Sequence, residues 1–222
     1  MNQNLTELIF ILDRSGSMFG LEPDTIGGYN SMITNQKKED GEARVTTILF
    51  DDTYKVVHDA VDIQSVQPMT TADYFVGGCT ALMDAVGKTI NNVGVRLANT
   101  PEEERPSKVV VVITTDGYEN ASREFTRAQI KQMIEHQTNT YSWQFMFLGA
   151  NIDAAAEAQS LGISGDWAAQ YAASEIGTKS VYDCVDSVIS SLRSNEVTMD
   201  FCLMDHYIDA EQANTARKTK KN

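Results

Sequence analysis

Short apolar runs that alternate with helix-like periodicities constrain the fold of this chain more than any other feature of its sequence. The run KVVVVITT (108–115) is apolar almost throughout, as expected of a central parallel strand that is covered on both faces. Similar runs occur at ELIFIL (7–12), SWQFMFLG (142–149) and, more weakly, AAQYAAS (168–174). Each of these four runs is predicted to be a strand, and helices are expected between them.

Apolar residues recur at helical spacing in the intervening segments. The clearest stripe begins at about Ala81 and comprises Leu82, Ala85, Val86, Ile90 and Val93. Four further helices are expected, at 24–37, around 125–134, at 152–162 and over 181–192.

The segments ARVTTILFD (43–51) and TYKVVHDAVD (53–62) are rich in β-branched residues and predict a hairpin. Asp51 and Asp52 lie at its turn, which explains these two aspartates better than a metal site does. Strands alternating with helices of this length predict a three-layer, Rossmann-like α/β fold. We expect a central, mostly parallel six-stranded sheet, with one antiparallel edge strand and helices on both faces.

The chain contains no internal repeat and no low-complexity linker, so we expect one domain over residues 1–195. Residues 196–222 are predicted to form a C-terminal extension that ends in a basic, disordered tail, ARKTKKN. The extension contains Asp200, Asp205 and Asp209. We considered the hypothesis that one of these aspartates binds a metal ion held by a neighbouring copy.

Composition excludes several classes of function. The net charge of −13 argues against nucleic acid as a partner, because phosphate binding favours a basic face. No apolar run approaches the roughly 20 residues that a membrane helix needs. The first residues, MNQNLTE, do not resemble a secretory signal, and the three cysteines are widely spaced and odd in number. These features predict a cytoplasmic protein with reduced thiols, of which Cys79 is expected to pack beneath its loop.

Oxygen-bearing side chains follow two of the predicted strands and precede a predicted helix. Asp13, Ser15 and Ser17 come after the first strand, and Asp116 directly follows the run at 108–115. Thr80 stands immediately before the helix that begins at about Ala81. In open α/β sheets, ligands bind beyond the carboxyl ends of the strands, so these loops can converge. A serine nucleophile, a phosphate cradle and a metal site all remain open for the first loop alone.

The chemistry of the whole set favours a metal. Five hard oxygen donors with only two negative charges suit a small hard cation such as Mg²⁺, which keeps waters or an open coordination position. Sulfur and imidazole ligands are absent from the set, which argues against zinc.

These residues resemble the metal-ion-dependent adhesion site of von Willebrand factor type A (integrin I-like) domains. That family carries Asp-x-Ser-x-Ser, then a Thr, then an Asp, and here Asp13, Ser15, Ser17, Thr80 and Asp116 fill all five positions. The resemblance extends over about residues 5–193, in the family's order of elements. The phrases DRSGSM, TIGGYNSM, GCTALMDAV and TTDGYEN resemble bacterial intracellular members.

The resemblance implies a function as well as a fold. It implies that the serine and threonine hydroxyls ligate Mg²⁺, with Mn²⁺ or Ca²⁺ as substitutes, and that the two aspartates act directly or through water. It further implies a non-enzymatic module whose metal accepts an Asp or Glu side chain from a protein partner. We predict a partner-binding rim around the metal, formed by Tyr74, Phe75, Tyr118, Glu119 and Asn120. For Tyr74 and Phe75 the alternative, which the sequence supports equally well, is that they only hold the loop in place.

Three alternatives were weighed against this interpretation. A structural subunit would use the metal only to tie the loops together. A metal-dependent phosphohydrolase would usually have a second carboxylate where this chain has Ser15. A serine hydrolase would need a Gly-x-Ser-x-Gly elbow and a nearby histidine, but the elbow is absent. His58, His136 and His206 are also far from the predicted strand ends.

Overall fold

Six strands form a single sheet in the computed structural model, which describes residues 1–194. The order across the sheet is β3-β2-β1-β4-β5-β6, and all neighbours are parallel except β2 and β3. The strands are β1 (Asn2–Asp13), β2 (Glu42–Phe50), β3 (Tyr54–Asp62), β4 (Pro106–Thr115), β5 (Gln144–Ala150) and β6 (Ala168–Tyr171). The predicted fold class, with its single antiparallel edge strand, is confirmed.

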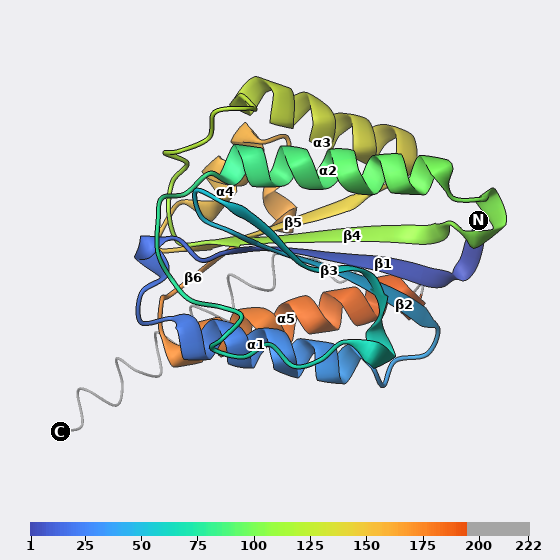
Figure 1. Ribbon diagram of the computed structural model, residues 1–222, viewed down its shortest axis with the longest axis horizontal. Coiled ribbons are helices and arrows are strands. Elements are labelled where there is room, and N and C mark those ends of the chain that lie inside the picture. The colour runs from blue at the N-terminus through green and yellow to red at the C-terminus, as the bar shows by residue number, and fades with distance from the viewer. Residues whose placement is uncertain (195–222) are drawn as a thin grey trace.

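Helices cover both faces of this sheet, as Figure 1 shows. One face carries α1 and α5, which pack against each other, and the other face carries α2, α3 and α4. The helices are α1 (Glu22–Gln36), α2 (Leu82–Asn99), α3 (Arg127–Tyr141), α4 (Ala154–Ser160) and α5 (Glu175–Ser194). No helix within residues 1–194 is both long and apolar enough to cross a lipid bilayer.

The central strand β1 shows why its sequence is apolar without alternation. Leu8, Phe10 and Leu12 belong to the core beneath α1 and α5, whereas Ile9 and Ile11 belong to the core beneath α2 and α3. Successive side chains of a strand point to opposite faces, so a strand buried on both faces needs apolar residues at every position.

The observed elements differ from the predicted ones at two places. β1 begins at Asn2 rather than Glu7, because its polar first residues still pair with β4, in which Asn2 lies opposite Pro106. Phe125 was expected within the third helix but precedes α3. Its ring packs against α2, where a Cβ added to Gly87 would lie 2.6 Å from it.

The topology places the ends of β1 and β4 side by side. These two strands are neighbours in the sheet and run parallel, with Leu12 opposite Thr114. Asp13 ends β1, and Asp116 follows the last residue of β4. The predicted site therefore lies at the carboxyl end of the sheet, which is on the left in Figure 1.

Candidate metal centre

Asp13 is held by three hydrogen bonds at the end of β1. Its side chain is fully buried, and Oδ1 accepts the Ser15 amide at 2.6 Å while Oδ2 accepts the Thr115 hydroxyl at 2.7 Å. The Tyr74 hydroxyl donates to the Asp13 carbonyl oxygen. The carboxylate is thus fixed in position by the chain's own groups before any ligand arrives.

Three hydroxyl groups meet beside this carboxylate. Ser15 Oγ lies 3.1 Å from Ser17 Oγ, and the Thr80 hydroxyl donates to Ser15 Oγ at 3.0 Å. A Cβ added to Gly117 would lie 3.1 Å from Ser17 Oγ and 3.3 Å from Thr80 Oγ1. The missing side chain at Gly117 therefore leaves open the space into which these hydroxyls point.

Asp116 completes the cluster and has an unused acceptor. Its Oδ1 atom is buried and has no hydrogen-bond partner. Burial raises the pKa of the Asp116 carboxyl, although a hydrogen bond with Ser17 opposes the change. A buried acceptor without a partner is costly, and a cation is one group that would satisfy it.

The electrostatics of Asp13 point the same way. Its pKa is raised to about 6, chiefly by burial and to a smaller extent by the nearby charge of Asp116, against the hydrogen bonds from Thr115 and Ser15. The neighbouring cation, Arg14, does not pair with the Asp13 carboxylate, because its guanidinium pairs with Asp51 at 3.1 Å instead. Two buried carboxyl groups thus share one small space without a cationic side chain between them.

The structure brings all five predicted ligands together, and the residue types fit a hard divalent cation. Oxygen atoms line the space, and the two carboxylates would be ionised by a bound cation. We define these five residues, Asp13, Ser15, Ser17, Thr80 and Asp116, as the metal cup. Their individual roles as ligands remain predictions.

Hydrogen bonds join the loops that carry the cup. The Thr80 amide donates to Asn120 Oδ1 at 2.9 Å, and the Asn120 amide donates back to the Thr80 carbonyl at 3.0 Å. Glu119 Oε2 accepts the Met83 amide at 2.9 Å. The Gly16 amide also donates to the Gly78 carbonyl at 3.1 Å.

The predicted rim needs correction. Tyr74 is 1% exposed and lies beneath the cup, because its hydroxyl reaches the Asp13 carbonyl, so it cannot contact a partner. Glu119 and Asn120 face the loop of Thr80 and act as its clamps. Phe75 and Tyr118 do lie on the surface, with 57% and 58% of their areas exposed.

Sequence reasoning missed one contributor and one surface residue, and it left a second contributor undecided. Thr115 was treated as part of a strand, although a threonine directly before the metal-site aspartate is a usable signal. For Tyr74 the sequence left a supporting role and a place on the rim equally open, because its contact with Asp13 spans 61 positions and is not visible in the sequence. Phe19 follows the serine motif by two positions and is 82% exposed.

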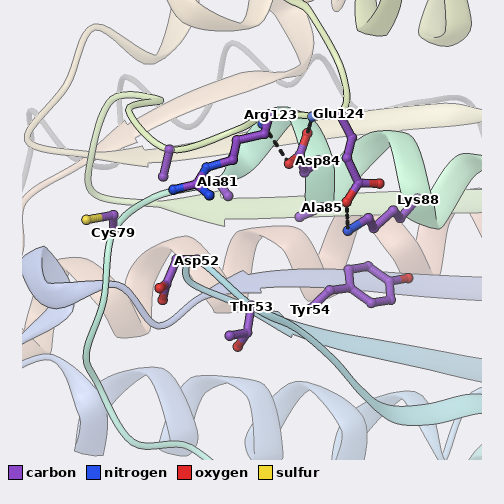
Figure 2. A pocket seen from close by; sticks show the side chains of 11 residues that line it. Asp52, Thr53, Tyr54, Cys79, Ala81, Asp84, Ala85, Lys88, Arg123 and Glu124 are labelled. Carbon is purple, nitrogen blue, oxygen red and sulfur yellow. Dashed lines mark hydrogen bonds and ion pairs between the residues drawn. The ribbon is translucent and has the colours of Figure 1, made fainter.

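A polar cavity of about 300 Å³ lies next to the cup, between the β2–β3 turn and the start of α2 (Figure 2). Three of its charged groups already have partners: the Asp84 carboxylate accepts the amides of residues 123–125, and Lys88 pairs with Glu124 at 2.7 Å. Cys79 also lines this cavity and is exposed, so the expectation that it packs beneath the loop is wrong.

The two described histidines lie elsewhere. His58 on β3 has its Nδ1 atom 3.1 Å from Thr47 Oγ1, and His136 on α3 lies 3.3 Å from Thr140. Within residues 1–194, neither of these histidines forms a hydrogen bond with Ser15 or Ser17. His206 lies outside the described residues.

Comparisons with known proteins were informative only at the level of structure. No protein-family model matches the sequence, and no curated protein matches it. Solved structures do match. Proximal thread matrix protein 1 from the mussel byssus aligns with a TM-score of 0.58 at 14% identity, over 85% of this chain and 47% of that one. A second structure of that protein, with TM-score 0.57 and 16% identity, is described as having a zinc-occupied MIDAS motif, the metal-ion-dependent adhesion site.

Two microbial structures give the same result. The ArnB paralog VWA2 from Sulfolobus acidocaldarius aligns with a TM-score of 0.52 at 12% identity, over 89% of this chain and 46% of that one. A von Willebrand factor type A protein from Catenulispora acidiphila aligns with a TM-score of 0.56 at 12% identity, over 84% of this chain and 43% of that one. The chain spans less than half the length of each of these matched chains. The six-stranded sheet and its two helical layers therefore have the fold of von Willebrand factor type A domains.

Proposed function

We propose that this chain is a non-enzymatic, Mg²⁺-dependent protein-binding module whose metal cup accepts a carboxylate from a partner. The observation that carries the proposal is the unpartnered, buried Oδ1 of Asp116 beside three mutually hydrogen-bonded hydroxyls. The zinc-occupied motif of the mussel protein supports a divalent metal in this fold. Mn²⁺ or Ca²⁺ would serve the same oxygen ligands.

The residues of the cup suit this task. The hydroxyls of Ser15, Ser17 and Thr80 and the carboxylates of Asp13 and Asp116 would hold the ion. A bound divalent cation supplies a coordination position that attracts an anionic oxygen. Because three of the five protein ligands are neutral hydroxyls and the cup leaves a coordination position open, an incoming Asp or Glu side chain could supply the missing oxygen ligand.

The structural-subunit alternative is weakened by the bonds between the loops. The clamp between Thr80 and Asn120 and the bond between Gly16 and Gly78 already join the three loops through the chain's own groups. A metal is therefore not needed to tie them together. A phosphohydrolase remains a weaker alternative, because Ser15 stands where a second catalytic carboxylate would be needed.

Selection of random peptides tests the proposal without knowledge of the partner. Peptides displayed on phage are selected on the immobilised full chain in Mg²⁺ and eluted with EDTA. The expected outcome is that enriched peptides share an Asp or Glu and fail to bind Asp116→Asn. The matched control is Asp52→Asn, an exposed acid in the neighbouring cavity, which should bind them normally.

Other outcomes would favour the alternatives. Peptides that stay bound in EDTA, or that lack acidic residues, would contradict a carboxylate-binding metal. Stabilisation by Mg²⁺ without any enriched peptide would favour the structural subunit. Hydrolysis of a generic phosphoester that disappears in Asp13→Asn would favour the phosphohydrolase.

A further inference from the structure

Exposed apolar side chains gather around the metal cup. Within residues 1–194, eight large hydrophobic side chains are strongly exposed, and three of these belong to segments that carry the cup. Phe19 follows Ser17 by two positions, and Tyr118 follows Asp116 by two. Phe75 lies over the Arg14 guanidinium, whose carbon is 4.7 Å from the ring centroid. We define Phe19, Phe75 and Tyr118 as the apolar rim.

The rim and the cup together specify the chemistry of an occupant. A carboxylate is needed at the metal, and apolar side chains next to it would cover the aromatic rings, whose exposure to water is unfavourable. Apolar anchors beside a charged contact are typical of the residues that dominate interface energetics. A suitable ligand is therefore a peptide in which an acidic residue directly adjoins large apolar residues.

The chain itself contains such a peptide. Residues 199–209, MDFCLMDHYID, lie outside the described structure and present three aspartates. Each aspartate is directly preceded by a methionine or an isoleucine. We propose that this segment of a second copy occupies the metal cup, with one of its aspartates on the metal and the neighbouring apolar residues on the rim. The inference rests on the proposed function, for which it names a partner.

The direction of α5 places the end of the described chain far from its own cup. This helix starts beyond β6 at the cup end, and Arg193 in its last turn donates to the Gly41 carbonyl, next to the first residue of β2. Twenty helical residues span about 30 Å, so the described chain stops at the far end of the sheet. Asp200 is six positions beyond Ser194, and an extended chain covers about 20 Å over that length. Only the more distant aspartates could return to their own cup, whereas all three can reach another copy.

The net charge of −13 opposes association between copies, but the basic end of the chain offers a local attraction. The last six residues, RKTKKN, carry four basic side chains, whereas the chain as a whole has a net charge of −13. A basic end on an acidic protein attracts the acidic surface of another copy and steers the encounter.

Sedimentation velocity of the full chain tests this proposal. In Mg²⁺ the sedimentation coefficient of wild type should rise with concentration up to about 100 µM, a range that reveals micromolar dissociation constants. The rise should disappear in EDTA and in the triple variant Asp200→Asn, Asp205→Asn, Asp209→Asn. The matched control, Glu196→Gln with Glu211→Gln, changes acids of the same region that are not directly preceded by a methionine or an isoleucine, and it should associate normally.

A mixing experiment tests the assignment to a second copy. An Asp116→Asn chain has a defective cup, and the triple variant has a defective segment, so each alone should remain monomeric. Their mixture should form a complex in Mg²⁺, because one supplies the cup and the other the segment. Monomers in the mixture, or association that survives EDTA, would overturn the proposal.

The outcome for this inference is separable from that for the proposed function. Thermal unfolding with and without Mg²⁺ is measured on the same samples. If Mg²⁺ stabilises wild type and not Asp116→Asn while all samples remain monomeric, the second-copy proposal fails and the metal cup stands. If Mg²⁺ has no effect on stability or on association, both fail.

Discussion

The buried carboxyl of Asp13 should impose an unusual pH dependence on the metal-free protein. Burial raises the pKa of this group from 3.8 to about 6 in the folded state. Between these two values the folded chain holds a proton that the unfolded chain has released. The free energy of unfolding should therefore fall as pH rises through this window, and the contribution of Asp13 should be lost above about pH 7.

The size of the effect follows from the two pKa values. A rise from 3.8 to about 6 corresponds to about 3 kcal/mol of stability lost by the metal-free protein across the window. For a domain of this size that is roughly 6 to 12 °C in Tm. Asp13→Asn should remove this loss, because an amide does not ionise and its oxygen can still accept the Ser15 amide. The new amide N–H can donate to the Thr115 hydroxyl.

Urea unfolding in EDTA, from about pH 4 to about pH 8, measures the difference between wild type and Asp13→Asn. Subtracting one curve from the other cancels the other titrating groups, among which Asp73 and Asp84 have lowered pKa values. The stability of the variant relative to wild type should rise by about 3 kcal/mol across the range. Parallel curves would refute the argument that Asp13 is a buried, uncompensated acid.

Mg²⁺ should offset part of this loss in wild type. The cup can bind a cation well only when its carboxylates are ionised, so stabilisation by Mg²⁺ should grow as pH rises from about 5 to about 7. With a Kd of about 1 mM and about 10 mM Mg²⁺, the expected gain is roughly 1.4 kcal/mol. A gain that is the same at both pH values would contradict the assignment of Asp13 to the cup.

Three further predictions concern the scaffold, and urea unfolding checks each of them. Tyr74→Phe removes the hydroxyl that donates to the Asp13 carbonyl, and it should cost about 1 to 3 kcal/mol and weaken Mg²⁺ binding. Gly28→Ala places a Cβ 2.3 Å from a tyrosine ring of α5 and should lower the free energy of unfolding by about 1 to 3 kcal/mol. The same substitution at a helical glycine whose added Cβ would meet no atom within 4 Å should not lower it. Arg96→Met leaves the buried Glu7 carboxylate without its 2.9 Å ion pair and should cost about 3 to 5 kcal/mol. Adding Glu7→Gln to Arg96→Met should recover most of the lost stability. A double variant no more stable than Arg96→Met would contradict the ion-pair argument.

Most of the fold was predictable because it depends on local patterns. Residues 109–113 of β4 are all buried and all apolar, and the stripe from Leu82 to Val93 faces the core beneath α2 as its spacing predicts. The first five residues of β1 were not predictable, since all but Leu5 are polar and they are ordered by pairing with β2 and β4. Local sequence does not record which distant strand will be a neighbour.

The candidate site was predictable in its ligands and much less so in its supports. Asp13 and Asp116 were found because the ends of parallel strands meet at one edge of the sheet. The supports lie on other loops, and Tyr74 contacts the site only because its segment returns to the sheet between β3 and α2. An aromatic residue before two glycines gives no sign of whether it will be buried or exposed.

The course of α5 also makes the protein a spacer. The cup and Ser194, the last residue that the structure describes, lie at opposite ends of α5 and are separated by about 30 Å, the length of that helix. Attachment of the protein to a support through its C-terminal end should therefore leave the cup facing the solution. Attachment through the loops at the carboxyl end of the sheet should block it.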